Sequence, residues 1–237
     1  EGGNVCFIDA EHALDPKYAE NIGVDIENLF VCQPDSGNMA LEVCVQMVES
    51  GAFSLIIVDS VAALVPQSEL EGEVGDASVG VMARMMSQAM RKLAGPIARS
   101  ECIVIFINQE RDMINAMGYG PKTTTCGGKA LKFYASVRID VTRIQTLKKS
   151  NEEYGIRVKA KVVKNKVAPP FRIGEYDVIF GKGISQAGCI VDLAIEHGLV
   201  EKKGAWFNYK DEKFQGRDKL VTTLENCPDE AEELLSA

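Results

Sequence analysis

Residues 1–110 alternate short apolar segments with segments of helical periodicity, and this alternation constrains the fold more than any other feature. The apolar segments are partly β-branched and predict strands at Val5–Asp9, Leu29–Gln33, Leu55–Ser60 and Cys102–Asn108. The helical period recurs between them, in Asp15–Ile22, Asn38–Ser50 and Ser78–Ser100. This strand–helix–strand order predicts an α/β fold with a mainly parallel, twisted sheet covered by helices on both faces.

The pattern changes after Lys132, where apolar segments follow one another through short polar turns. Strands are expected at Val137–Arg143, Ile156–Asn165 and Tyr176–Phe180, as antiparallel additions to the same sheet. Gly181–Gly183 has the composition of a linker. The sequence therefore predicts a core of residues 1–182 followed by a second, smaller domain.

Residues 183–237 have the composition of a small α/β domain. The segments that predict it are a helix, a hairpin and two short helices, at Cys189–His197, Trp206–Tyr209, Asp218–Asn226 and Pro228–Ser236. These segments are expected to form a small α/β appendage to the larger domain.

Composition narrows the class of protein. Hydrophobic residues make up 46% of the chain and charged residues 25%, which is typical of a globular protein. No apolar run could span a bilayer and the start does not resemble a signal peptide, so we expect a cytoplasmic protein without membrane partners. The seven cysteines form no C-x-x-C pair and indicate reduced core thiols rather than a zinc site. The chain begins at Glu1 directly before a strand, so we expect a fragment.

Charge is spread unevenly along the chain. The net charge is −8, yet residues 137–173 hold ten basic residues, among them Arg157, Lys164 and Lys166, against three acidic ones. The stretch after Leu224 contains no Lys or Arg. A local basic block of this kind keeps nucleic-acid binding open despite the overall negative charge.

Polar residues stand where the predicted parallel strands end. The segment Leu55–Ser60 has the form of a Walker B strand, in which Asp59 would hold a magnesium-bound water beside a nucleotide. Glu11, after the first strand, is a candidate base for the water that attacks a phosphate, and Gln109, after the fourth, can bind a γ-phosphate. Each has a structural alternative: a turn cap for Asp59, an N-cap or loop acid for Glu11, and a turn-bound amide for Gln109.

Two loops and one helix face complete the candidate site. Glu110–Gly128 is long, rich in glycine and threonine, and without a helical or strand period, and a shorter Gly-rich loop begins at Glu71. On the helix that follows, Arg84, Ser87 and Arg91 share a face that can track a phosphate backbone. The alternative is an ordinary solvated helix face.

Taken together, several strings of residues are specific enough to indicate a family. They are FIDAEHALDP from Phe7, IVDSVAAL from Ile57, ARMMSQAMRKL from Ala83, FINQ from Phe106, ALKFYASVR from Ala130 and VKNK from Val163. The chain resembles the bacterial RecA recombinases over essentially its whole length. The resemblance implies a RecA-type P-loop ATPase core with a small C-terminal domain.

The resemblance also implies roles for individual residues. Catalytic roles fall on Glu11, Gln109, Lys164 and Lys166, the two lysines acting on a neighbouring subunit's nucleotide. Nucleotide contacts fall on Asp59, Ser60, Asp15 and Tyr18, with Mg²⁺ held by Asp59 through water. Positions that line single-stranded DNA are Arg84, Ser87, Arg91, Gly127 and Gly128. The loops Glu71–Val79 and Glu110–Cys126 match the family's two DNA-contacting loops.

The function implied is a DNA-dependent ATPase that uses ATP and Mg²⁺, forms helical homo-oligomers on single-stranded DNA, and exchanges strands with double-stranded DNA in recombination, DNA repair and the SOS response. No G-x-x-x-x-G-K-[ST] motif occurs, so this chain alone is expected to be inactive. Cys126 and Glu110 depart from the family pattern beside Gln109. The alternatives are a hexameric helicase with the same core and a non-catalytic DNA-binding fragment.

Overall fold

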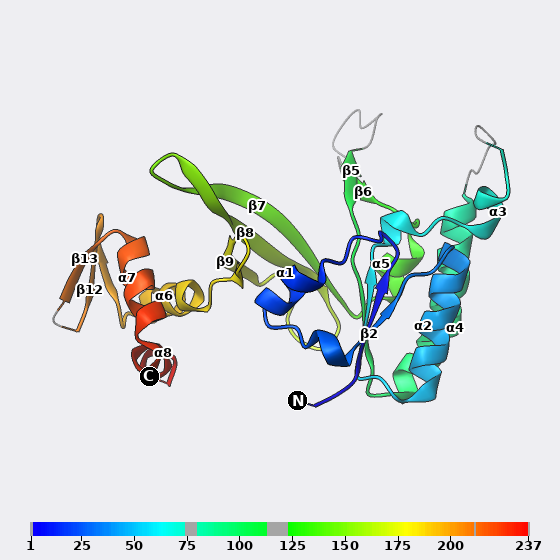
Figure 1. The fold of residues 1–237 in the computed structure, drawn as a ribbon, viewed down its shortest axis with the longest axis horizontal. Helices are drawn as coiled ribbons and strands as arrows, with labels where there is room; N and C mark the ends of the chain where they lie inside the picture. The colour runs from blue at the N-terminus through cyan, green and yellow to red at the C-terminus, as the bar shows by residue number, and fades with distance from the viewer. Residues whose placement is uncertain (1, 74–79, 113–122, 211, 237) are drawn as a thin grey trace. The chain divides into compact units, whose positions relative to one another are not determined.

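The computed structural model describes residues 2–73, 80–112, 123–210 and 212–236 (Figure 1). The chain divides into two compact units, Glu1–Ala135 and Ser136–Ala237. Each unit has its own hydrogen-bonded sheet and its own buried apolar cluster. No helix in the described part of the chain is both long enough and apolar enough to cross a membrane.

The first unit is built on a four-stranded parallel sheet in the order β2-β1-β3-β4. Its strands are β1 (Val5–Asp9), β2 (Leu29–Cys32), β3 (Leu55–Asp59) and β4 (Ile103–Phe106). The predicted strands are confirmed, and no predicted end differs from the observed one by more than two residues. Because all four run in the same direction, their carboxyl ends meet at one edge of the sheet.

Helices surround this sheet unevenly. They are α1 (Pro16–Asn21), α2 (Gly37–Ser50), α3 (Gln67–Leu70), α4 (Val81–Arg99) and α5 (Ala130–Tyr134), with short 3₁₀ turns η1 (Ile26–Asn28) and η2 (Val61–Ala63). The crossovers through α2 and α4 move along the sheet in the same direction, so right-handed connections place both helices on one face. There they bury Ile56, Met86 and Leu93.

The opposite face of the sheet has less cover than the sequence predicts. The crossover through α1 moves the other way, and α1 and α2 lie on opposite sides of β1 (Figure 1). α1 has only six residues, and Ala19 is its one buried side chain. Ile103, Ile105 and Ile107 remain 40–63% exposed. The second face therefore lacks a full helical layer within the described part of this unit.

The long loop after β4 begins and ends in regular structure, which corrects the prediction that it has no strand period. Its two arms, β5 (Glu110–Asp112) and β6 (Thr123–Thr125), pair as an antiparallel ribbon. The β-branched threonines favour the extended conformation that this pairing needs. The middle of the loop, residues 113–122, and residues 74–79 of the Gly-rich loop lie outside the described residues.

The second unit opens with a four-stranded antiparallel sheet in the order β10-β9-β8-β7. Its strands are β7 (Val137–Lys149), β8 (Glu152–Asn165), β9 (Ile173–Ile179) and β10 (Gly183–Ile184). The prediction that these strands join the parallel sheet is wrong. A strand pattern indicates that strands are antiparallel but not which sheet they extend. The predicted linker at Gly181–Gly183 is also wrong, because Gly181 and Lys182 lie in a turn and Gly183 begins β10, which pairs with β9.

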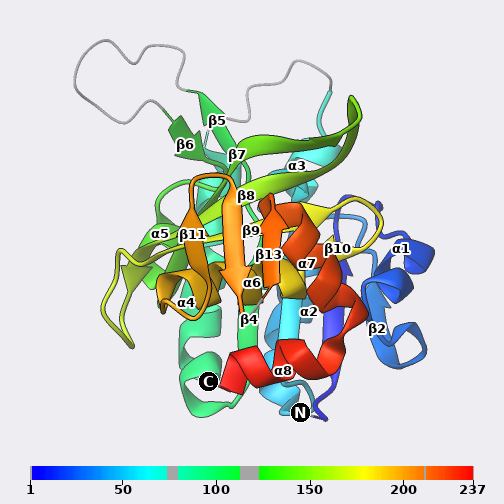
Figure 2. The same cartoon turned by 90° about the vertical axis from the view of Figure 1, so that its left-hand side faces the viewer.

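The rest of the second unit contains the predicted small α/β elements. They are α6 (Gln186–Glu196), β11 (Glu201–Lys203), β12 (Trp206–Tyr209), β13 (Glu212–Gln215), α7 (Arg217–Asn226) and α8 (Pro228–Ser236). The three short strands lie side by side (Figure 2). α6 begins three residues before the predicted start because the Ser185 side chain accepts a hydrogen bond from the Gly188 amide and caps the helix.

Candidate functional site

The carboxyl edge of the parallel sheet brings together three residues predicted from the sequence. One carboxylate oxygen of Glu11 accepts a short hydrogen bond from the Ser60 hydroxyl and a second, at 3.3 Å, from the Gln109 side-chain amide. These residues follow β1, β3 and β4. Ser60 is buried, whereas Glu11 and Gln109 are exposed. A fixed carboxylate therefore faces solvent where a ligand can reach it.

Asp59 adds a second carboxylate to this edge. The pairing of β1 with β3 sets Asp9 opposite Asp59, and the Asp59 carbonyl accepts a hydrogen bond of 2.8 Å from the Ala10 amide. Burial raises the pKa of Asp59, and the negative charges of Glu11 and Asp9 raise it further. The edge thus carries more negative charge than its own groups neutralise, which suits a bound cation.

Asp9 has a different role from its neighbours. Its side chain is 1% exposed and accepts hydrogen bonds from the Gln33 side chain and from the Leu14 and Ala13 amides, at 3.0–3.1 Å. Burial by itself would raise the pKa of Asp9, but these hydrogen bonds outweigh it and lower the pKa. Asp9 therefore holds in place the turn that presents Glu11, a role that the sequence did not indicate.

Asp15 and Tyr18, matched to the adenine position, lie together at the start of α1. The Asp15 carboxylate caps this helix by accepting hydrogen bonds from the Lys17 and Tyr18 amides, at 2.9 and 3.1 Å. Tyr18 is 41% exposed, so its ring is accessible. The cap explains Asp15 structurally, and contact with adenine stays a prediction for both residues.

Asn108 links two parts of the site. Its side-chain oxygen accepts a hydrogen bond of 2.9 Å from the backbone N–H of Gln109, and its side-chain nitrogen donates one of 3.0 Å to the Cys126 carbonyl. The sequence placed Asn108 at a strand end but indicated no partner for it. A polar side chain between an apolar strand and a functional residue was the only signal available.

The glycine pair that follows Cys126 packs against α4. Gly127 and Gly128 have φ angles of +80° and +75°, which glycine adopts without strain. A Cβ atom on Gly127 would lie 3.0 Å from the Met86 side chain, and one on Gly128 would lie 2.8 Å from the Ala83 Cβ atom. Both positions therefore require glycine, and the pair lies beside the first half of α4.

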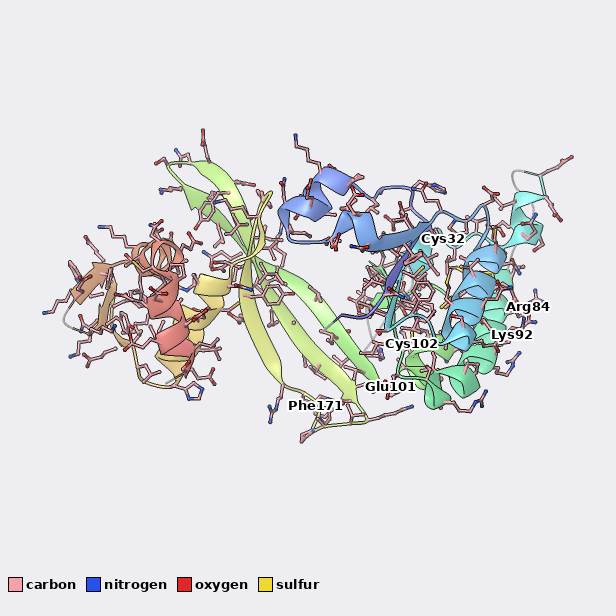
Figure 3. All side chains as sticks on the ribbon, turned by 60° about the horizontal axis from the view of Figure 1, so that its bottom comes forward. Cys32, Arg84, Lys92, Glu101, Cys102 and Phe171 are labelled. Atoms are coloured by element: carbon pink, nitrogen blue, oxygen red, sulfur yellow. The ribbon has the colours of Figure 1, made fainter. Side chains whose placement is uncertain are left out.

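The polar face predicted on α4 is present. Arg91 donates a hydrogen bond of 2.8 Å to the Ser87 hydroxyl, and the Arg84 guanidinium donates one of 3.4 Å to the Gly80 carbonyl. Both arginines are exposed, and Arg84 extends outward from the helix (Figure 3). The buried residues of α4 are Met85, Met86, Ala89, Met90 and Leu93. The shared face is confirmed, and its contact with DNA stays a prediction.

Lys164 and Lys166 belong to the second unit, near the end of β8. Lys164 lies opposite Arg138 on β7. Partial burial and the positive charges of Lys166 and Arg138 lower the pKa of Lys164. The predicted role of both lysines at a neighbouring subunit's nucleotide remains a prediction.

Arg157, counted in the basic block, does not present a free charge. It contacts Asp177 at 3.0 Å, Asp192 at 2.9 Å and Glu175 at 3.2 Å. Arg217 binds the same two aspartates, so Arg157, Arg217, Asp177 and Asp192 form what we call the arginine–aspartate network. It connects β8 and β9 with α6 and α7. The available sequence signal was Asp177 between Tyr176 and Val178 in β9, since a carboxylate that becomes buried is normally paired.

Comparison with known proteins agrees with this geometry. The family model described as the RecA N-terminal domain matches residues 1–185, and that of the RecA C-terminal domain matches residues 188–237. The chain belongs to the RecA family. It is 61% identical over 230 residues to the RecA protein of Synechococcus elongatus and 59% identical over 234 residues to that of Nostoc punctiforme.

These alignments cover nearly all of the chain but only part of its relatives. They span 97% of the chain and 64% of the Synechococcus RecA protein, and 98% and 65% for the Nostoc protein. The chain therefore spans less than two thirds of the length of these RecA proteins.

Proposed function

We propose that this chain is part of a DNA-dependent ATPase that assembles on single-stranded DNA, pairs it with homologous double-stranded DNA and exchanges strands in recombination and repair. The observation that carries this proposal is the Glu11 carboxylate held by Ser60 and Gln109 beside Asp59. In that position Glu11 is arranged to orient and deprotonate a water molecule. Membership of the RecA family supports the same reaction.

The donor set fits Mg²⁺ and a nucleotide. Asp59 would hold Mg²⁺ through water, and Mg²⁺ when bound neutralises charge on the phosphates. Burial and, to a smaller extent, the negative charges of Glu11 and Asp9 raise the pKa of Asp59, and a bound cation would offset both effects. Gln109 can donate its amide hydrogens to a γ-phosphate, while the accessible Tyr18 ring and Asp15 fit the adenine side. Lys164 and Lys166 would stabilise the developing charge from a neighbouring subunit.

The proposed DNA path runs along the polar face of α4 and the glycine pair. Arg84, Ser87 and Arg91 supply donors to phosphates, and Gly127 and Gly128 let a backbone approach α4 closely. We propose a helical homo-oligomer on single-stranded DNA as the working assembly. We also propose a functional division into a core of residues 1–182 and a small domain of residues 183–237.

The decisive experiment replaces the proposed base in the full-length protein. Glu11→Gln keeps the shape of the side chain but cannot accept a proton from water. ATP turnover is expected to fall about 10²–10⁴-fold while nucleotide binding persists. Glu49→Gln, an exposed glutamate on α2, is the matched control and is expected to leave turnover unchanged. Turnover of the Glu11→Gln protein within twofold of the parent would contradict the proposal.

The two alternatives predict different assemblies. A hexameric helicase forms closed rings, whereas the proposed recombinase forms helical filaments on single-stranded DNA. Electron microscopy of the full-length protein with DNA and an ATP analogue distinguishes them. A non-catalytic DNA-binding protein would show neither ATP turnover nor nucleotide-dependent assembly.

A further inference from the structure

We infer that Asn108 is a positioning residue that couples the nucleotide-sensing end of β4 to the glycine pair beside α4. The inference rests on the proposed function, because it assigns Gln109 to the nucleotide and the glycine pair to DNA. Its structural basis is the double hydrogen bond of one side chain. The Asn108 side chain accepts a hydrogen bond from the backbone N–H of Gln109 at 2.9 Å and donates one to the Cys126 carbonyl at 3.0 Å.

The Cys126 end of this connection has little freedom. Cys126 directly precedes Gly127, which is buried, and a Cβ atom on Gly127 would lie within 3.0–3.1 Å of Met86 and Val61. A Cβ atom on Gly128 would lie still closer to its neighbour, 2.8 Å from the Ala83 Cβ atom on α4. A shift of the Cys126 carbonyl would therefore press on α4 at Ala83 and Met86, which are sequence neighbours of Arg84 and Ser87.

The Gln109 end has two possible partners. In the present structure the Gln109 side chain donates to Glu11 at 3.3 Å, a long hydrogen bond that a phosphate oxygen can replace. Gln109 can thus exist in a Glu11-bound or a phosphate-bound arrangement, which supplies the two states that coupling requires. Asn108 holds the backbone N–H of Gln109 and not its side chain, so a change of side-chain partner would reach Cys126 by displacing the Gln109 backbone, which Asn108 links to the Cys126 carbonyl.

The β5–β6 ribbon provides a second connection between the same two ends. Glu110 pairs with Thr125, so the residues directly after Gln109 and directly before Cys126 are hydrogen-bonding neighbours. Asn108 precedes the ribbon and Cys126 follows it, and the Asn108 side chain donates a hydrogen bond to the Cys126 carbonyl. The ribbon holds the two arms side by side, and Asn108 ties that pair to β4.

The test measures coupling in the full-length protein. Affinity for a single-stranded oligonucleotide is measured by fluorescence anisotropy with a non-hydrolysable ATP analogue and with ADP, and the ratio of the two gives the coupling. Asn108→Asp keeps the acceptor for Gln109 but places a second acceptor against the Cys126 carbonyl. The ratio is expected to fall roughly tenfold, while affinity for each nucleotide changes by less than about twofold. The serine side chain of Asn108→Ser cannot reach both partners, so the ratio of the two DNA affinities is expected to fall in this variant as well.

Asn4→Asp is the matched control. Asn4 also donates its side-chain amide to a distant carbonyl, that of Ala52 at 3.0 Å, but at the opposite edge of the same sheet. This variant is expected to keep the full coupling ratio. Asn108→Asp combined with Gln109→Ala is expected to show no further loss beyond Gln109→Ala alone, because both act on one connection.

The outcomes separate the two proposals. A parent that responds to nucleotide, together with an Asn108→Asp protein of equal ratio, overturns the role of Asn108 and leaves the proposed function standing. Equal loss in Asn4→Asp also overturns it, because the effect would then be one of general stability. A parent whose DNA affinity does not depend on nucleotide overturns the proposed function and the coupling role together.

Discussion

Two clusters of carboxylates in this molecule differ in how their charge is balanced. In the arginine–aspartate network, Asp177 and Asp192 each contact both Arg157 and Arg217. At the carboxyl edge of the parallel sheet, neither Glu11 nor Asp59 forms an ion pair among the residues that the structure describes; Glu11 accepts hydrogen bonds only from neutral groups.

This difference separates structural charges from charges kept for a ligand. Asp177 is only 4% exposed, and a buried carboxylate is tolerated when cations and hydrogen bonds satisfy it. Glu11 is exposed, and burial together with the negative charges of Glu11 and Asp9 raises the pKa of Asp59. The network therefore stabilises the second unit, whereas the sheet edge is arranged for a cation and a reacting water.

Replacing Arg217 is expected to have the largest effect on the arginine–aspartate network. Arg217→Ala removes one of the two arginines that bind the buried Asp177 and the partly buried Asp192, and is expected to lower the free energy of unfolding of the full-length protein by about 3 kcal/mol. Urea denaturation followed by circular dichroism measures this loss. Lys203→Ala removes an exposed ion pair, in which the Lys203 and Glu201 side chains are 69% and 58% accessible. This variant is expected to leave the free energy of unfolding unchanged. Equal effects of the two variants would contradict the structural role of the network.

Asp9 lies at the sheet edge, like the carboxylates proposed to serve a ligand, but hydrogen bonds satisfy it. Replacing Asp9 therefore tests whether a sheet-edge carboxylate can be purely structural. Asp9→Asn sets an amide nitrogen against the donors of Leu14 or Gln33, at an expected loss of about 2 kcal/mol near neutral pH. The pKa of Asp9 is lowered in the folded state, so its contribution is present above the ordinary aspartate pKa.

As the pH falls through the folded-state pKa of Asp9, its carboxylate is protonated and that contribution is lost. The difference in unfolding free energy between the parent and Asp9→Asn should therefore stay constant near neutral pH and shrink once the pH falls below the ordinary aspartate pKa. A difference that stays constant or grows in acid would show that the Asp9 carboxylate does not stabilise the turn.

The parallel sheet and the main site residues were predictable from the sequence for one physical reason. Apolar period and strand order are local properties, and parallel strands necessarily bring their carboxyl ends to one edge. Glu11, Ser60 and Gln109 were therefore expected together before any distance was known, and the hydrogen bonds to Glu11 confirm that they meet. The polar face of α4 was predictable from helical spacing in the same way.

The partnerships that depend on contacts distant in the sequence were not predictable. Arg157 was counted as a free basic residue because its partners Asp177 and Asp192 lie 20 and 35 residues away. Asn108 gave no sign of its bond to Cys126, since the loop between them showed no period. The separate antiparallel sheet was missed because hydrogen-bonding partners of a strand are decided by tertiary packing and not by its own pattern.

The central claim is that the sheet-edge carboxylates serve a ligand rather than the fold, and Asp59→Asn tests it most directly. Burial and the negative charges of Glu11 and Asp9 raise the pKa of Asp59, so its charged form destabilises the folded state at neutral pH and removing the charge is expected to increase stability.

The deciding measurement is thermal unfolding of the full-length parent and Asp59→Asn proteins, each with and without Mg·ATP. A ligand role for Asp59 predicts that Asp59→Asn unfolds at the same or a higher temperature than the parent without ligand, yet gains much less thermal stability from Mg·ATP. A variant that is clearly less stable without ligand, or that gains as much from Mg·ATP as the parent, would contradict it.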